Sequence, residues 1–236
     1  MGRRPVSSDR TLSVVIPVLN EAASIARTLR DARRACPNGV IIVVDGGSSD
    51  ATVAMAEGLA DIVAHSPPGR ARQMNAGAGT VDAAVLLFLH ADTQLPDGAE
   101  RLIAEGLADG RAWGRFDVAI AGRSRLLPLV AAMMNLRSRS TGVATGDQAI
   151  FATREAFAAV EGFPQIALME DVAMSKRLRR LSRPACVRAK AITSGRRWDA
   201  NGAVRTIAAM WLLRLAFVCG VPPGRIANLY ARLKAR

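Results

Sequence analysis

The sequence has few aromatic residues and no basic run interleaved with stacking side chains. Aromatic residues make up 4% of its 236 residues. Because proteins that bind nucleic acid through single strands use aromatic platforms beside a basic groove, a nucleic-acid partner is disfavoured. The net charge of +12 then has three remaining explanations. The protein binds an anionic lipid, it binds a phosphorylated substrate, or it has a solvated arginine-rich surface without a specific partner.

Cysteine and histidine are also scarce. The cysteines Cys36, Cys186 and Cys219 are odd in number and lack the spacing of a metal site. They are typical of buried thiols in a reducing compartment, so we expect a cytoplasmic protein. His65 and His90 are the only histidines. Their spacing does not indicate a shared metal site, and His90 is interpreted as a strand-end residue or as an extra metal or phosphate ligand.

No apolar run is long enough to span a bilayer, which takes about 20 residues. The most apolar late segment, residues 203–221, is interrupted by Arg205 and Arg214. It predicts a helix docked on the protein. With the basic tail 225–236 behind it, the alternative is a helix at a membrane surface, peripheral at the inner face. The polar, basic residues 1–10 do not have the pattern of a secretory signal.

Short apolar segments alternate with amphipathic ones through the first half of the chain. This alternation predicts a parallel, doubly wound α/β sheet. No Gly-x-Gly-x-x-Gly follows the first strand and no Walker-type Gly-Lys-Ser/Thr occurs, so the dinucleotide-binding and P-loop versions are excluded. We expect strands at 12–16, 40–44, 62–64, 85–89, 113–120 and 146–151, helices at 96–108, 126–139, 153–160 and 169–181, and a basic loop at 69–79 in which a helical turn can form.

The first helix is expected to follow Asn20, which can cap it. Ile25, Leu29 and Ala32 then share one face of that helix. No internal repeat or low-complexity linker divides the chain. We therefore expect one domain over residues 1–200 and a helical extension at 201–236 packed on the same domain.

Polar residues follow several of the expected strands. The apolar run 85–89 changes abruptly to His90-Ala91-Asp92-Thr93, and the strand 40–44 ends at Asp45. In open α/β sheets ligands bind beyond the carboxyl ends of strands. Asp92 is therefore expected near a bound cation or phosphate, unless it only opens a turn toward Pro96.

These polar segments resemble, in the same order, the motifs of family 2 glycosyltransferases with the GT-A fold. The resemblance covers residues 12–198 and rests on the order of the motifs, because each alone is common. The matching segments are Val15-Ile16-Pro17-Val18-Leu19-Asn20-Glu21, Val44-Asp45-Gly46-Gly47-Ser48-Ser49-Asp50-Ala51-Thr52, the basic loop 69–77 ending in Asn75-Ala76-Gly77, His90-Ala91-Asp92, Glu170-Asp171 and Ser194-Gly195-Arg196-Arg197-Trp198.

The resemblance implies a GT-A-type, Rossmann-like α/β fold: a mostly parallel mixed sheet flanked by helices, with C-terminal helices. A nucleotide-binding half would span about 11–95 and an acceptor half about 96–200. The donor would be a UDP- or GDP-linked sugar, with Asp45 accepting a hydrogen bond from the base. The resemblance assigns the other nucleotide contacts to Pro17, Asn20, Glu21, Arg70, Arg72, Asn75, Ala91 and Asp92.

Asp92 is also the implied ligand of Mg²⁺ or Mn²⁺, hard cations that bridge phosphate oxygens. A departing diphosphate needs such a cation, whereas a glycosidase needs a proton donor instead. Three positions depart from the family pattern. His90 replaces the first acid of the metal motif and Met74 replaces an arginine. Ser194 replaces a glutamine, which argues against a processive polysaccharide synthase.

The resemblance assigns the catalytic base to Asp171, with Glu170 as its rival or orienting neighbour; both could instead be charges at a helix start. One base and one displacement predict an inverting, hexosyltransferase-type enzyme. We expect the carboxylates of Asp92 and Asp171 to face one cavity. The acceptor, an unidentified hydroxyl compound, would meet Asp147, Gln148, Arg197 and Trp198, although Trp198 is equally well explained as a core anchor.

Two other classes stay open at this point. A sugar-nucleotidyltransferase would carry a glycine-rich loop with a basic residue after the first strand, where this chain has residues 17–21. A non-catalytic relative that only binds nucleotide is compatible with the altered metal motif.

Overall fold

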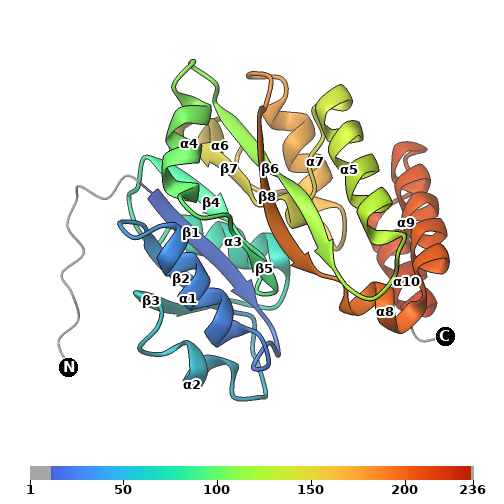
Figure 1. Cartoon of the computed structure of the whole chain (residues 1–236), viewed down its shortest axis with the longest axis horizontal. Helices are drawn as coiled ribbons and strands as arrows, with labels where there is room; N and C mark the ends of the chain where they lie inside the picture. Colours follow the sequence, from blue (N-terminus) through green and yellow to red (C-terminus); the bar gives the residue numbers. More distant parts are fainter. Residues whose placement is uncertain (1–11, 235–236) are drawn as a thin grey trace.

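The computed structural model describes residues 12–234 (Figure 1). The strands are β1 Leu12–Val18, β2 Val40–Asp45, β3 Ile62–His65, β4 Val85–Phe88, β5 Thr93–Gln94, β6 Trp113–Ala121, β7 Ile150–Thr153 and β8 Ala185–Ser194. The helices are α1 Ile25–Ala35, α2 Thr52–Ala56, α3 Arg70–Ala78, α4 Ala99–Leu107, α5 Leu127–Thr141, the 3₁₀ helix η1 Gly146–Gln148, α6 Arg154–Ala159, α7 Glu170–Leu178, α8 Arg196–Asn201, α9 Ala203–Val218 and α10 Pro223–Lys234.

The strands form one mixed sheet in the order β3-β2-β1-β4-β7-β6-β8-β5. The strands β3, β2, β1 and β4 are parallel, so their carboxyl ends meet at one edge. The strand β7 is antiparallel to both β4 and β6, and β5 is antiparallel to β8. The mixed α/β fold confirms the GT-A-type class with its mixed sheet, and the parallel strands are those of the first half of the chain, where the alternation was found.

Helices cover both faces of the parallel part of the sheet. On one face Val14 and Ile16 of β1 pack with Ile25 and Leu29 of α1, as the spacing of the apolar residues predicts. On the other face Val15 packs in a second apolar cluster with residues of α3. The adjacent residues of β1 point to opposite faces, which explains why the whole strand is buried.

The segment 69–79, predicted as a loop, forms the helix α3. Gly69 adopts φ +135° just before the helix begins. Ala71, Met74 and Ala78 then fall on one buried face against the sheet. The prediction was wrong because the glycines and arginines of the segment suggest a loop, whereas its small apolar residues can pack closely on the strands.

Three further local predictions differ from the structure. Asn20 does not cap α1, because it has φ +55° and α1 begins five residues later, at Ile25, with Ser24 at the N-cap position. The strand expected at 146–151 begins only at Ile150, since η1 precedes it with a capping box between Thr145 and Gln148. The strand β8 was not predicted, because charged residues interrupt its apolar pattern.

The C-terminal helices α9 and α10 pack on α7. Met169, Val172, Leu213 and Ile226 form the buried cluster that joins them. In Figure 1 these red helices lie at the end of the molecule away from β3. Among residues 12–234, no helix combines the length and apolarity that crossing a membrane requires.

The cysteines differ in exposure. Only Cys36 is buried, Cys186 is half-buried and Cys219 is exposed, so the expectation of three buried thiols is wrong for two of them. Burial and the nearby charge of Glu100 raise the pKa of Cys36 to about 12, which keeps its thiol protonated and unreactive.

Candidate active site

The loops that follow β1 and β2 are hydrogen-bonded to each other at the carboxyl edge of the sheet. The backbone N–H of Asn20 donates to Ser48 Oγ at 2.9 Å, and Ser49 N–H donates to Asn20 Oδ1 at 2.8 Å. Glu21 N–H donates to Thr52 Oγ1 at 2.8 Å. The two predicted nucleotide motifs therefore form one rigid rim, with Pro17 buried in the strand beneath it.

Asp45 organises the turn at the end of β2. Its carboxylate accepts from Gly47 N–H at 2.9 Å and from Ser48 N–H at 3.1 Å. Burial alone would raise the pKa of Asp45, but hydrogen bonds from Ser48 and Gly47 outweigh it and lower the pKa below its ordinary value. The ring of His65 lies 3.6 Å away. Asp45 is thus held as a carboxylate, an acceptor of the kind its predicted role requires.

A residue that the sequence analysis did not single out joins the two strand ends. Gln73 of α3 is buried, and its Nε2 donates to Val18 O at 2.7 Å and to Val44 O at 2.8 Å. Because a buried carbonyl group is costly to leave without a partner, this amide holds β1 and β2 in register beside the rim. The sequence signal was a lone polar residue on the face that α3 buries.

The other predicted residues of α3 point in different directions. Arg70 and Arg72 line the cavity described below. Asn75 instead faces the segment between α6 and α7, where its Oδ1 accepts from Phe163 N–H at 2.9 Å and its Nδ2 donates to Phe163 O at 2.8 Å. Its contact with a nucleotide stays a prediction.

Asp92 lies beside a guanidinium group contributed by α8. Arg196 Nη2 is 3.4 Å from Asp92 Oδ2 and 3.1 Å from Glu21 Oε2. The hydrogen bond to Glu21 is the main cause that raises the pKa of Arg196. Two carboxylates around one cationic group are a set of hard oxygen donors that fits Mg²⁺ or Mn²⁺.

The described residues offer few further side-chain ligands for a cation at Asp92. Within the described part of the chain, no cluster of three or more His, Cys, Asp and Glu side chains could hold a metal ion. A cation at Asp92 would therefore need ligands from a bound diphosphate and water, as is usual for Mg²⁺. The neighbouring Ala91 is buried, and its carbonyl oxygen accepts from Thr28 Oγ1 at 2.6 Å.

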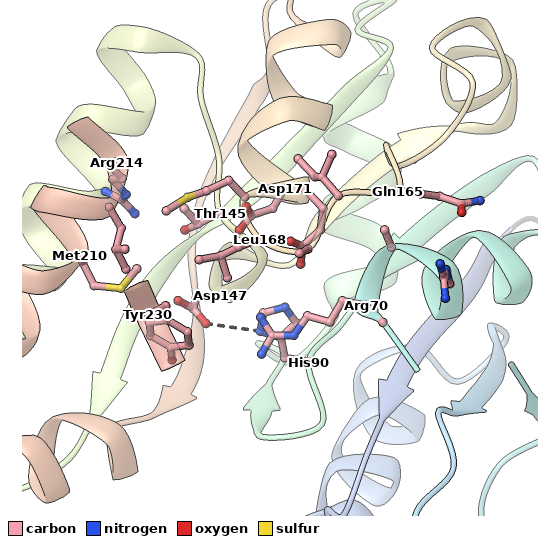
Figure 2. A pocket seen from close by; sticks show the side chains of 18 of the residues that line it. Arg70, His90, Thr145, Asp147, Gln165, Leu168, Asp171, Met210, Arg214 and Tyr230 are labelled. Carbon is pink, nitrogen blue, oxygen red and sulfur yellow. Dashed lines mark ion pairs between the residues drawn. The ribbon is translucent and has the colours of Figure 1, made fainter. Parts of the chain in front are cut away.

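A cavity of about 510 Å³ lies between α3, the η1 region, the start of α7 and the C-terminal helices. Figure 2 shows Arg70 and His90 on one side of it and Arg214 and Tyr230 on the other. Asp171 lines this cavity, whereas Asp92, two residues beyond His90, does not. The convergence of the Asp92 and Asp171 carboxylates on one cavity therefore stays a prediction.

The acidic pair at the start of α7 has two different environments. Glu170 is 6% exposed, and burial, followed by the charge of Asp171, raises its pKa. Asp171 Oδ2 accepts from Gly146 N–H and Oδ1 from Val172 N–H, both at 2.7 Å. These two hydrogen bonds hold the Asp171 carboxyl group in one orientation. Glu170, with its raised pKa, is the better placed of the two to stay protonated.

The backbone next to Asp171 is shaped by His90. His90 Nδ1 lies 3.4 Å from Asp147 Oδ1, the ion pair drawn in Figure 2. A Cβ atom on Gly146 would overlap the His90 ring, so only glycine allows this approach. His90 therefore positions the η1 region whose N–H group binds Asp171.

The remaining predicted acceptor residues are not brought together. Gln148 is buried, and its Oε1 accepts from Thr145 N–H at 3.2 Å, so its contact is internal. Trp198 is half-buried on α8 and does not line the cavity. The side chain of Arg197 lies outside the described part of the structure.

Solved structures with this fold are nucleotide-sugar glycosyltransferases. A Pyrobaculum calidifontis mannosyltransferase in complex with GDP-Man and Mn²⁺ is 18% identical with a TM-score of 0.65, over 94% of this chain and 69% of that one. Mycobacterium tuberculosis glucosyl-3-phosphoglycerate synthase in complex with Mg²⁺ and UDP is 21% identical with a TM-score of 0.62, over 91% and 81%. S. aureus TarS 1–349 in complex with UDP-GlcNAc is 15% identical with a TM-score of 0.62, over 78% and 58%.

The fold thus defines a protein of the GT-A class. The family model of glycosyl transferase family 2 matches residues 13–151, more than half of the chain. The chain therefore belongs to glycosyl transferase family 2 and is a glycosyltransferase. A comparison with curated proteins finds no match.

Proposed function

We propose that this protein is an inverting glycosyltransferase that uses a divalent cation to move a sugar from a UDP- or GDP-linked donor to an acceptor hydroxyl. The observation that carries the proposal is the Glu170-Asp171 pair on the wall of the cavity, in which the N–H groups of Gly146 and Val172 hold the Asp171 carboxyl group and burial raises the pKa of Glu170. Two adjacent acids in different environments are typical of an acid–base site.

Asp171 is the proposed general base. It would accept the proton of the acceptor hydroxyl as that oxygen attacks the anomeric carbon from the face opposite the diphosphate. Because one displacement inverts configuration, no second carboxylate is needed as a nucleophile. The N–H groups of Gly146 and Val172 hold the Asp171 carboxylate in one orientation, which favours a productive approach.

The donor would lie along the rim formed by the loops after β1 and β2. Asp45 would accept a hydrogen bond from the base, and Arg70 and Arg72 would meet diphosphate oxygens, for which guanidinium groups are well suited. The relatives in complex with GDP-Man, UDP-GlcNAc and UDP support a donor of this kind.

Asp92, with Glu21 beside it, is the proposed holder of Mg²⁺ or Mn²⁺. A cation bound there would offset the negative charge that develops on the departing diphosphate. Arg196 contacts both carboxylates and has to release them, after which its guanidinium can bind phosphate. Structures of relatives that contain Mn²⁺ or Mg²⁺ support this assignment.

We further propose that the protein works at the cytoplasmic face of a membrane. Large apolar side chains are exposed on neighbouring parts of α5 and α9, among them Leu136 at 69% and Trp211 at 63%. An apolar surface on a protein with a net charge of +12 is suited to an anionic lipid surface.

The decisive experiment follows the release of UDP or GDP from a panel of nucleotide sugars, with and without Mn²⁺. The donor should raise the melting temperature of the wild type and of Asp171→Asn alike, because binding stabilises the folded state. Transfer should fall by about 100-fold or more in Asp171→Asn, the usual contribution of a general base. Near-normal transfer by that variant would refute the assigned base. Metal-dependent binding without turnover by the wild type would identify a non-catalytic relative instead.

A further inference from the structure

Two arginines lie behind Asp171 with unused hydrogen-bond donors. Arg137 belongs to α5 and Arg214 to α9. The Nε atoms of both residues and Nη2 of Arg137 are buried and have no hydrogen-bond partner. Burial and the nearby charge of Arg214 lower the pKa of Arg137 to about 10, and burial also lowers the pKa of Arg214. The two cations are thus near each other and poorly solvated.

Arg115 shows how this protein pairs an arginine elsewhere. Arg115 of β6 is fully buried and forms an ion pair with Asp117, which also pairs with Arg139. Arg137 and Arg214 are half-buried, and among the described residues no ion pair joins either of them to a carboxylate. Because a buried donor without an acceptor is costly, a ligand that supplies acceptor oxygens to these N–H groups would be bound favourably.

Arg214 relates this pair to the acceptor. It lines the cavity together with Asp171 and Asp147, whose charges act on its guanidinium. Arg137 is not among the residues that line the cavity, and the charges of Arg214 and Asp171 act on it. In Figure 2 Arg214 and Arg70 lie on different sides of these two carboxylates. With Arg70 assigned to the donor diphosphate, the side of Arg214 is left for the acceptor.

We propose that Arg214 and Arg137 bind an oxyanion of the acceptor, and that this oxyanion is a phosphate monoester. The proposal rests on the proposed function and specifies its acceptor class. A phosphate presents several oxygens and can take N–H groups from two separate helices at once. When the phosphate is bound at these arginines, the hydroxyl of the same molecule can lie at Asp171. The negatively charged phosphate then lies on the side away from the Asp171 carboxylate, which would repel it. The phosphate can come from a soluble phosphorylated alcohol or from a lipid headgroup.

The first test measures phosphate binding without any donor. Wild type, Arg137→Met, Arg214→Met and the control Arg225→Met, at an exposed position of α10, are melted in rising inorganic phosphate at constant ionic strength. Phosphate should stabilise the wild type and the control saturably, and it should not stabilise the two other variants. Without phosphate, those variants should melt at or above the wild-type temperature, because each removes a buried unpaired charge.

Two results of this test would overturn the proposal. Equal stabilisation of all four proteins would mean that phosphate binds elsewhere. A lower melting temperature of Arg137→Met and Arg214→Met without phosphate would mean that the guanidinium groups serve the fold. Failure of the wild type to bind any nucleotide sugar would count against the proposed function alone, because phosphate is titrated separately.

The second test compares acceptors with the identified donor. Glycerol, glycerol phosphate and vesicles that contain lysophosphatidic acid, a lipid phosphate monoester with a free hydroxyl, are offered to the wild type and to Arg214→Met. The wild type should prefer a phosphate-bearing acceptor, and the variant should raise the KM for it by about 10- to 100-fold, the cost of a charge-assisted hydrogen bond. The control Arg225→Met, at an exposed position, should keep the wild-type KM for the same acceptor. Preference for soluble or vesicle phosphate identifies the source, and equal use of glycerol and glycerol phosphate contradicts the proposal.

Discussion

At the residue scale, the acidic pair at the start of α7 owes its chemistry to exposure and backbone contacts. Glu170 and Asp171 are adjacent in the chain, yet only Asp171 accepts a hydrogen bond from Gly146. Both acids line a smaller cavity together with Met74 and Phe163, but only Glu170 is buried, which makes its ionisation unfavourable. A sequence motif can identify the two adjacent acids. Which of them acts as the base and which stays protonated depends on their surroundings in the folded protein.

The raised pKa of Glu170 predicts a pH dependence of stability. The unfolded chain ionises this group near its ordinary pKa of 4.5, whereas the folded chain keeps it protonated to higher pH. The folded state therefore binds more protons in that interval, and its stability falls as pH rises from 4.5 through the folded pKa. Glu170→Gln should remove this part of the decline and be more stable than the wild type at pH 8.

Denaturant unfolding of the wild type and Glu170→Gln between pH 4 and 8 measures the effect. Glu57→Gln is the matched control, since it makes the same change at an exposed position. Parallel stability curves for wild type and Glu170→Gln would contradict the prediction, because they would show that Glu170 ionises at the same pH in the folded and the unfolded chain.

The sequence indicated some of the residues that the structure places at the site and missed others. Asp45, Asp92 and Asp171 stand out as acids after strands or at a helix start. Gln73 and the Arg137–Arg214 pair do not stand out, because a buried polar side chain looks the same in a sequence as an exposed one. Their importance comes from neighbours that are distant along the chain.

At the element scale, α3 is placed by a single close approach to the sheet. A Cβ atom on Gly77 would overlap Val15 Cγ1 and come within 2.9 Å of Val44 Cγ2. Both contacts are to branched side chains of buried strands, which cannot move aside. The close packing brings Arg70, Arg72 and Gln73 to the carboxyl ends of β1 and β2.

Gly77→Ala should therefore destabilise the protein by about 1–3 kcal/mol through overpacking. It should also weaken donor binding, because α3 carries the arginines assigned to the diphosphate. Gly79→Ala is the control in the same segment, since its Cβ would meet nothing closer than 3.5 Å. The free energy of unfolding and the donor Kd of both variants are the measurements, and equal stability of the two would contradict the packing argument.

The elements also differ in how far the sequence predicted them. Helix α1 and strands β1, β2 and β4 were predicted because their apolar pattern is regular. Helix α3 and strand β8 were not, because close glycine packing and a partly exposed, charged strand both disturb that pattern. Tertiary contacts with β1 and β6 determine these two elements.

At the scale of the whole molecule, the mixed sheet separates two regions of different chemistry. The rim at β1, β2 and β4 carries the residues assigned to the nucleotide. The cavity is completed by α9 and α10, which contribute Met210, Arg214 and Tyr230 to its wall. The C-terminal helices therefore belong to the site as well as to the exposed apolar surface.

That surface predicts binding to anionic membranes. The fluorescence of Trp211 should shift to shorter wavelength when phosphatidylglycerol vesicles are added, because the exposed indole enters an apolar environment. The double variant Trp211→Ser and Leu215→Ser, at positions 63% and 61% exposed, should cosediment with vesicles at least about tenfold less. Leu19→Ser is the control, because Leu19 is an exposed apolar residue in the loop after β1, outside the surface of α5 and α9. Equal cosedimentation of both variants would rule out this surface as the contact.

The sequence by itself determined the class of fold, the order of the motifs and the acidic residues that carry the proposed chemistry. Apolar periodicity depends on neighbours along the chain, so it can be read without knowing the fold. Only the tertiary structure decided that β7 is antiparallel to β4 and β6 and that β5 is antiparallel to β8. It also decided that Gln73 joins two strands and that the charges of Arg137 and Arg214 lie near each other. These features depend on burial and on contacts between distant segments, which arise only once the chain has packed.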